Sequence, residues 1–277
     1  MSSETDALLI IEPSPAWRTV DLGEVWRYRE LLYFFVWRDV KVRYKQTVLG
    51  ISWAIIQPLF AMIVFAFFFG RVAKLPSDGI PYPLFTYAGL LPWTFFANGL
   101  GTGSQSVLSN ANLVTKVYFP RLLVPISAIL TGIVDFALAL LMLAPLLIWK
   151  HTMPAAESLF FVPLSIGIAF LFVFGLSTWL SAMVVRYRDI RHVVPFVIQI
   201  WMFATPIVYP LSFIPQKWRW AVSLNPMVPV VEAFRSSIFG RPVEVGGLLY
   251  ALVVSLVLIV TGSIYFRRLE RLFADVM

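Results

Sequence analysis

The chain has 277 residues, of which 59% are hydrophobic and only 13% are charged, and its mean hydropathy is +0.81. Soluble globular domains have about 25% charged residues, so this composition excludes a soluble domain and predicts a membrane protein. The chain has no cysteine, which excludes disulfides, thiolate metal sites and a cysteine nucleophile. Its net charge of +7 alone would fit a nucleic-acid binder, but the positions of the cations indicate a membrane topology instead.

Residues 1–25 are predicted to be an N-terminal cytoplasmic tail, and residues 26–277 a membrane domain. The first 20 residues contain only the short apolar run 8–11, which acidic residues flank. A secretory signal needs a basic segment followed by a longer apolar one. We therefore expect no cleavable signal, and the first membrane span should direct insertion itself.

Residues 26–46 are predicted to form an amphipathic helix at the membrane surface. An apolar stripe recurs with helical spacing on one side, and cations gather on another, as is typical of an interfacial helix. The stripe is formed by Tyr33, Val36, Trp37, Val40 and Tyr44, and the cations on the other side are Arg38, Lys41 and Lys45, with Arg43 as a further candidate for the cytoplasmic gate. Two interpretations are open: a membrane anchor, or a helix whose cations also bind the phosphate of a lipid-linked substrate.

Six long apolar stretches follow, and no Lys or Arg lies within any of them. They are residues 49–70, 84–108, 122–149, 159–185, 193–209 and 247–266. A helix needs about 20 apolar residues to cross the bilayer, and five stretches reach that length, whereas the fifth has 17. Only helices satisfy their backbone polar groups within a single segment in lipid, so we predict an all-α membrane protein with six transmembrane helices.

The distribution of cations predicts the orientation. In this topology 15 of the 22 Lys and Arg residues lie on the side of the N-terminus. Cytoplasmic loops carry the excess of positive charge, so both termini are predicted to be cytoplasmic.

The loop at 110–121 mixes cations with apolar side chains, which a simple connection would not need. Exposed apolar residues on a cytoplasmic loop indicate a docking site for another protein. The alternative is that these residues only begin the third membrane helix. The candidate docking residues are Lys116, Val117, Tyr118, Phe119 and Arg121.

Residues 211–240 are rich in proline and tryptophan, but Lys217, Arg219, Glu232 and Arg235 interrupt them. We predict a re-entrant pair of short helices joined near Asn225 and entering the membrane from the outer face. Such backbone is tolerated at membrane depth only next to protein or a water-filled cavity, so the segment would line a pathway. An amphipathic hairpin on the outer surface is the alternative.

Several chemistries have no sequence support. The chain contains no Gly-Lys pair and therefore no phosphate-binding P-loop. His151 and His192 fall on opposite sides of the predicted membrane, so we expect no shared metal site. Asp135 lies in the third span, where a charge costs a few kcal/mol; it either acts on substrate or holds helices together. A secondary transporter or a membrane glycosyltransferase would need more ionisable groups than these spans contain.

Several spaced motifs carry a family resemblance. They are residues 38–50 (RDVKVRYKQTVLG), Trp53, Gln57-Pro58, residues 88–93 (AGLLPW), residues 112–121 (NLVTKVYFPR), residues 186–190 (RYRDI) and residues 224–227 (LNPM). Together they resemble the membrane subunits of bacterial ABC-type polysaccharide exporters, from about residue 25 to the C-terminus.

The resemblance implies a homodimeric inner-membrane permease that works with two copies of a separate cytoplasmic ABC ATPase. ATP and Mg²⁺ would bind that partner, with no cofactor or nucleic acid bound by this chain. The cargo would be a polysaccharide on a lipid carrier: O-antigen on undecaprenyl pyrophosphate, with capsular polysaccharide or teichoic acid as alternatives. Residues 26–46 would form a cytoplasmic gate, 110–121 the coupling loop and 211–240 the outer gate.

Aromatic residues make up 16% of the chain, more than belts at the membrane interface require. Sugar rings pack their C–H faces on aromatic rings, so we expect some of these side chains to line a conduit at a dimer axis. The alternative for each single residue is that it faces lipid or packs between helices. The candidates for the conduit and outer gate are Phe60, Phe67, Tyr87, Trp93, Phe95, Phe96, Trp201, Trp218, Trp220 and Asn225.

Overall fold

The structure is a computed structural model that describes residues 22–45, 47, 49–270 and 273. Within these residues the regular structure is helical and includes no strand. The predicted tail at 1–25 lies outside the described residues except for its last four positions, which belong to a short helix, α1 (Leu22–Arg27). The all-α prediction is confirmed.

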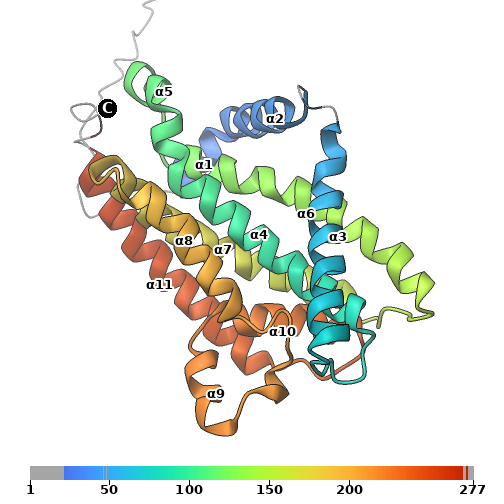
Figure 1. Cartoon of the computed structure of the whole chain (residues 1–277). Coiled ribbons are helices and arrows are strands. Elements are labelled where there is room, and N and C mark those ends of the chain that lie inside the picture. Colours follow the sequence, from blue (N-terminus) through green and yellow to red (C-terminus); the bar gives the residue numbers. More distant parts are fainter. Residues whose placement is uncertain (1–21, 46, 48, 271–272, 274–277) are drawn as a thin grey trace, which may run out of the picture.

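The two longer N-terminal helices lie at a steep angle to each other. Helix α2 (Arg29–Lys45) lies across one end of the bundle, and α3 (Trp53–Phe65) stands beside it (Figure 1). A single turn, η1 (Gly50–Ser52), joins them. Gly50 has a φ of +50°, a conformation that glycine adopts without steric cost. Helix α3 continues into the wider turns of η2 (Ala66–Val72).

The remaining elements follow in chain order. They are α4 (Tyr82–Ser109), α5 (Ala111–Lys116), α6 (Leu123–Trp149), α7 (Ser158–Arg186), α8 (Ile190–Phe203), η3 (Leu211–Phe213), α9 (Gln216–Ser223), α10 (Met227–Ile238) and α11 (Val245–Glu270). Helices α4, α7 and α11 run side by side through the bundle (Figure 1).

Among the described residues, four helical segments are long and apolar enough to cross a membrane. They are Gly50–Val72, Leu123–Trp149, Ser158–Arg186 and Val245–Glu270, which match four of the six predicted stretches. Helix α4 has 28 residues, but its polar side chains lower its hydropathy. Helix α8 has only 14 residues. It ends at Phe203, six residues before the predicted fifth stretch ends.

Close backbone contact joins α7 and α11. A Cβ added at Gly262 would lie 2.9 Å from the carbonyl oxygen of Gly175, and one added at Gly175 would lie 2.8 Å from Cβ of Leu258. Small residues let membrane helices approach closely enough to gain van der Waals packing. The two glycines therefore set the distance between these helices.

An aromatic cluster packs α8 against the bundle. The Phe96 ring of α4 stacks on Phe172 of α7, with ring centroids 5.7 Å apart. Trp201 of α8 packs edge-on against both rings, at 5.1 Å from Phe96 and 6.0 Å from Phe172. Such pairs stabilise a contact beyond the area that they bury.

A second apolar cluster joins α2 to the loop after α5 and to the end of α11. Its centre is the Phe35 ring of α2, which lies edge-on to Phe119 at 5.4 Å. Phe35 is buried, whereas Tyr33 and Trp37 of the predicted apolar stripe are exposed. Phe35, which lies outside that stripe, therefore packs α2 onto the bundle, and the placement of the stripe at the lipid headgroups stays a prediction.

Helices α9 and α10 form the expected pair of short helices, joined at Asn225 and Pro226. The Asn225 side chain donates to Thr205 Oγ1 at 2.9 Å and accepts from the backbone N–H of Met227 at 3.0 Å. Helix α10 is buried against α4, α7 and α11, whereas α9 is exposed at the end of the molecule opposite α2 (Figure 1). The position of the pair relative to the bilayer stays a prediction.

Candidate functional site

A cavity of about 730 Å³ opens between α3, α4 and α6, beneath α2. Ligand sites usually have volumes of about 300–1,000 Å³. Helices α3 and α4 converge at the end away from α2 and separate toward it (Figure 1), and α6 forms the back wall. The cavity therefore extends from the α2 end of the bundle toward its middle.

The lining combines polar and apolar groups, with aromatic rings from α2, α3, α4 and α6. Its side chains that bear on binding are Asp39, Arg43, Tyr44, Trp53, Gln57, Phe95, Asn98, Thr102, Gln105, Asn110, Asp135 and Phe136. Asn98, Thr102 and Gln105 recur at i, i+4 and i+7, which places them on one face of α4. The sequence itself carries this spacing, in polar residues rather than in the aromatic residues predicted to line a conduit.

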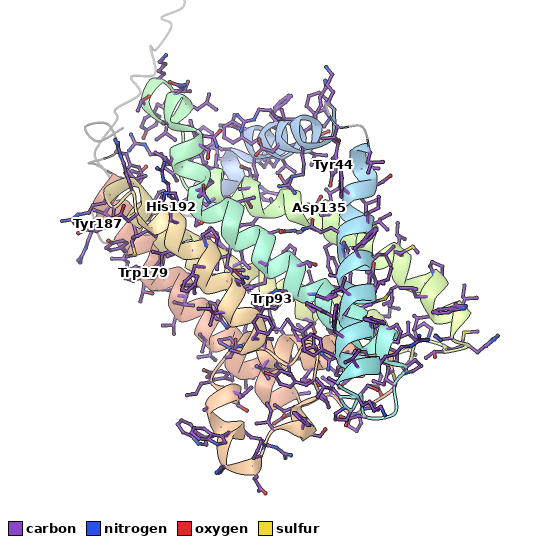
Figure 2. The ribbon with its side chains drawn as sticks, in the orientation of Figure 1. Tyr44, Trp93, Asp135, Trp179, Tyr187 and His192 are labelled. Carbon is purple, nitrogen blue, oxygen red and sulfur yellow. The ribbon has the colours of Figure 1, made fainter. Side chains whose placement is uncertain are left out.

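Asp135 of α6 fixes the C-terminal end of α2 over the cavity. Its carboxylate forms an ion pair with Arg43 and accepts a hydrogen bond from the Tyr44 hydroxyl. Figure 2 shows Tyr44 at the end of α2 with Asp135 on the helix beneath it. Burial, followed by the neighbouring carboxylate, raises the pKa of Tyr44, so the phenol stays protonated as a donor. Of the two sequence interpretations of Asp135, the geometry fits the one in which its carboxyl joins helices.

Two of the four cations proposed to bind lipid phosphate already have anionic partners in the chain. Arg43 pairs with Asp135, and Arg38 Nη2 lies 2.8 Å from Oδ1 of Asp39. Arg38 also donates to Asn110 Oδ1 at 2.9 Å, which links α2 to the start of α5. Lys41 places its Nζ 4.4 Å from the centroid of the Trp37 ring, and Lys45 is exposed. Lys41 and Lys45 are therefore accessible to a phosphate, whereas Arg38 and Arg43 could bind one only by leaving their carboxylate partners.

The predicted docking loop divides into an exposed part and a buried part. Lys116, Val117 and Tyr118 are exposed, and Tyr118 retains 76% of its accessible surface. Phe119 retains only 5%, because its ring packs against Phe35. Arg121 Nε lies 3.6 Å from Oε1 of Glu270, which ties the loop to α11. The burial of Phe119 corrects its inclusion among the exposed side chains of the loop, Arg121 is partly buried, and the docking role of the loop stays a prediction.

The alternative for this loop, that it begins the third span, does not hold. Helix α5 ends at Lys116, Val117 is extended, and α6 begins at Leu123. The residues between the two helices form a connection with no regular helix.

The structure also corrects the proposed aromatic conduit. Tyr87, Trp93, Phe95 and Phe96 are at most 3% exposed, because α4 is a central helix of the bundle, as the position of Trp93 in Figure 2 illustrates. The Tyr87 hydroxyl donates to the carbonyl oxygen of Ala139 at 2.8 Å. Side chains buried inside one copy cannot line a channel between two copies, although Phe95 lines the cavity.

Other conduit candidates lie at the surface. Phe60 and Phe67 of the first span are exposed, as are Trp218 and Trp220 of α9. Trp201 is half-buried in the aromatic cluster of α8. Asn225 acts within the turn between α9 and α10. The exposed aromatic residues remain candidates for a conduit surface, and nothing in their own contacts assigns them to it.

Arg235 is a functional candidate that the sequence did not single out. It is 2% exposed, donates to the carbonyl oxygen of Pro206 at 2.6 Å, and lies 3.8 Å from the ring centroid of Phe85. A Cβ added at Gly89 would lie 2.8 Å from its Nη2. Arg235 therefore links α10, α4 and the segment after α8.

Comparison with known proteins identifies the family. Residues 30–239 match the family described as "ABC-2 type transporter". The chain belongs to this family. It is 32% identical over 256 residues to the O-antigen export system permease protein RfbA of Myxococcus xanthus. This alignment covers 91% of this chain and 97% of the relative.

Further relatives are more distant but nearly as complete. RfbA of Klebsiella pneumoniae is 27% identical over 248 residues, which covers 90% of this chain and 95% of the relative. The polysialic acid transport protein KpsM of Escherichia coli is 25% identical over 237 residues, which covers 84% of this chain and 91% of the relative. The resemblance inferred from the sequence motifs is confirmed.

Proposed function

We propose that this chain is the permease subunit of an ATP-driven exporter that moves a lipid-linked polysaccharide across the bacterial inner membrane. The observation that carries the proposal is its similarity, over nearly the whole length of both chains, to proteins named as O-antigen export permeases. The proposed cargo is O-antigen on undecaprenyl pyrophosphate. The similarity to KpsM favours capsular polysaccharide as the second candidate, and teichoic acid remains the third.

The proposed permease has six spans, with both termini in the cytoplasm, and acts as a homodimer. Helix α4 would be the second span, and α8 with the turn that follows it the fifth. The length of α4, about 42 Å at 1.5 Å per residue, supports a crossing, because the apolar core of a bilayer is about 30 Å thick. The buried α10 beside the exposed α9 supports a re-entrant outer gate.

ATP hydrolysis would be performed by two copies of a cytoplasmic ABC ATPase, which bind ATP and Mg²⁺. The exposed Val117 and Tyr118, with Lys116 beside them, would dock on that subunit. Helix α5, which directly precedes Val117, lies at the same end of the molecule as α2 (Figure 1). The α2 cations would meet the carrier phosphate there, with Lys41 and Lys45 as the first contacts.

Gene deletion in the native bacterium tests this function. Without the chain, the surface polysaccharide should disappear while lipid-linked polymer accumulates inside the cell. Lipopolysaccharide gels and capsule staining of the same cells would show which polymer is lost. The wild-type chain should restore export only together with its ATPase, and an ATPase with its P-loop lysine replaced is the control. Unchanged surface polymer after deletion, or rescue without any ATPase, would refute the proposal.

A further inference from the structure

Three carboxamides in the cavity lack hydrogen-bond partners. Within the described part of the chain, the side chains of Gln57, Asn98 and Gln105 make no hydrogen bond to protein. Among the other described carboxamides, Asn110 Nδ2 donates to the carbonyl oxygen of Ser106 at 2.9 Å and Asn225 bonds to Thr205, whereas the exposed Asn112, Gln199 and Gln216 make no such bond. A carboxamide offers one acceptor oxygen and two donor hydrogens, so the three together form an unused set of donors and acceptors.

These carboxamides lie in segments that are otherwise apolar. Gln57 belongs to the apolar span Gly50–Val72, and Asn98 is exposed on the facing side of α4. An unpaired polar group in hydrocarbon costs several kcal/mol. Lipid chains are therefore a poor occupant for this cavity, whereas water or a polar ligand would satisfy its walls.

The charged groups of the cavity are already paired. Among the described lining residues, Asp39 pairs with Arg38, and Asp135 pairs with Arg43. The walls therefore present no free charge to a ligand. This balance favours a neutral ligand with many hydroxyl groups over a phosphate, for which the accessible Lys41 and Lys45 on α2 are better suited.

The cavity also offers an aromatic ring that could contact the apolar face of a ligand. Trp53 lines the cavity from α3 and is half-exposed, so its ring is available for contact. Sugars combine apolar C–H faces with hydroxyl groups that both donate and accept. A tryptophan ring beside several carboxamides offers a partner to each part of such a molecule.

We propose that this cavity binds neutral sugar units of the exported polymer, with Gln57, Asn98 and Gln105 bonding the hydroxyls and Trp53 contacting a ring face. The inference rests on the proposed function only in taking a saccharide as the cargo. It adds a sugar-binding site within a single protomer, separate from the cations that would hold the carrier phosphate.

The lack of cysteine allows a direct test. Thr102→Cys introduces one thiol into the cavity wall, where the threonine hydroxyl donates to the carbonyl oxygens of Asn98 and Gly99 in its own helix. The complete complex with its ATPase, in inside-out membrane vesicles, is treated with a membrane-impermeant maleimide. Short oligosaccharides released by mild acid from the strain's own surface polymer should slow labelling, whereas undecaprenyl phosphate should not. Leu141→Cys, at an exposed apolar position of α6, is the control for a thiol facing lipid.

The carboxamides are tested in the same background. Replacing Gln57, Asn98 and Gln105 together with leucine should raise the oligosaccharide concentration needed for half-protection by about tenfold or more, since each lost hydrogen bond weakens binding several-fold. Gln199→Leu, an exposed carboxamide of α8 outside the cavity, should leave that concentration unchanged.

Four outcomes would overturn the proposal. In the Thr102→Cys chain, three results would do so: the oligosaccharide does not slow labelling, only undecaprenyl phosphate slows it, or the thiol is not labelled at all because lipid or a second copy covers the wall. In the triple leucine variant, the fourth is that the oligosaccharide protects the thiol as well as before. Surface polymer is scored in the same cells. If export is intact but protection is absent, only the sugar site fails; if the deletion strain still exports polymer, the proposed function fails.

Discussion

At the scale of single residues, Asp135 decides how α2 closes over the cavity. A lone carboxylate in a membrane span is costly, and here that cost is offset by Arg43 and the Tyr44 hydroxyl. The sequence shows that such a charge needs a partner. It cannot show that the partner comes from a helix outside the spans, because the path of α2 depends on the turn at Gly50 and on Phe35 packing against Phe119.

A double-mutant cycle on Arg43 and Asp135 tests this link. Asp135→Asn should destabilise the protein by about 1–2 kcal/mol, because it leaves a partly buried guanidinium without its anion, and partial exposure reduces the effect. Arg43→Gln should have a similar effect. The double variant should cost clearly less than the sum of the two, as measured by thermal unfolding in detergent; strictly additive losses would contradict the link.

Tyr118 and Phe119 are neighbours that should respond differently to the same change. Tyr118→Asp alters an exposed side chain, so we expect normal thermal stability but export-coupled ATP hydrolysis reduced several-fold if this residue docks on the ATPase. Phe119→Asp buries a charge in the cluster around Phe35 and should destabilise the protein by about 3 kcal/mol or more. Unfolding curves and ATPase assays on both variants would separate docking from packing; equal stability losses would refute the division.

At the scale of elements, the crossing of α7 and α11 depends on the absence of side chains. Gly262→Ala would place a Cβ 2.8 Å from Trp179 Cδ1 and 2.9 Å from the carbonyl oxygen of Gly175. We expect a loss of about 1–3 kcal/mol from overpacking. Gly246→Ala on the same helix is the matched control, since nothing lies within 4 Å of its added Cβ. It should be neutral or slightly stabilising, because alanine favours helix; similar losses in both variants would contradict the close contact.

The boundaries of the long helices could be read from the sequence because apolar length and flanking charges mark them. The predicted stretch 159–185 became α7 (Ser158–Arg186), and 122–149 became α6 (Leu123–Trp149). The fifth stretch ended early, at Phe203, and the sequence carried a signal for this in Pro206, since a residue before proline disfavours helix. The residues on both sides of Pro206 are apolar, so hydrophobicity alone extended the predicted stretch to residue 209.

Which face of each helix contacts lipid, protein or the cavity could not be predicted from the sequence in the same way. In a helix that is apolar all round, periodicity does not separate lipid, protein and cavity. Tyr87 and Phe96 were therefore assigned to a conduit, whereas the packing of α4 between its neighbours buries them. The polar face of Asn98, Thr102 and Gln105 was the readable part of α4, because carboxamides stand out against apolar neighbours.

At the scale of the whole molecule, most of the cations gather at one end. Helix α2, helix α5, the turn between α7 and α8, and the C-terminal end of α11 lie at that end (Figure 1). They carry Lys41, Lys116, Arg188 and Arg267. Folding alone has thus brought together the segments that the charge rule predicts to be cytoplasmic, and the proposed six-span topology requires α4 to cross the membrane between the first and third spans.

That requirement distinguishes six spans from four. If only the four most apolar segments crossed, the connections after α4, α6 and α7 would change sides, and the turn after α6 would be cytoplasmic. With α4 and α8 also crossing, Thr152 in that turn faces the outside, and Arg188 after α7 faces the cytoplasm. In the cysteine-free chain, we therefore expect Thr152→Cys to react with an impermeant maleimide added to spheroplasts, and Arg188→Cys to react only after lysis. The four-span topology predicts the reverse pattern. Surface polysaccharide in the same strains is the control that both variants fold. Reversed labelling in exporting cells would exclude the six-span arrangement, and with it the cytoplasmic position of the α5 docking surface.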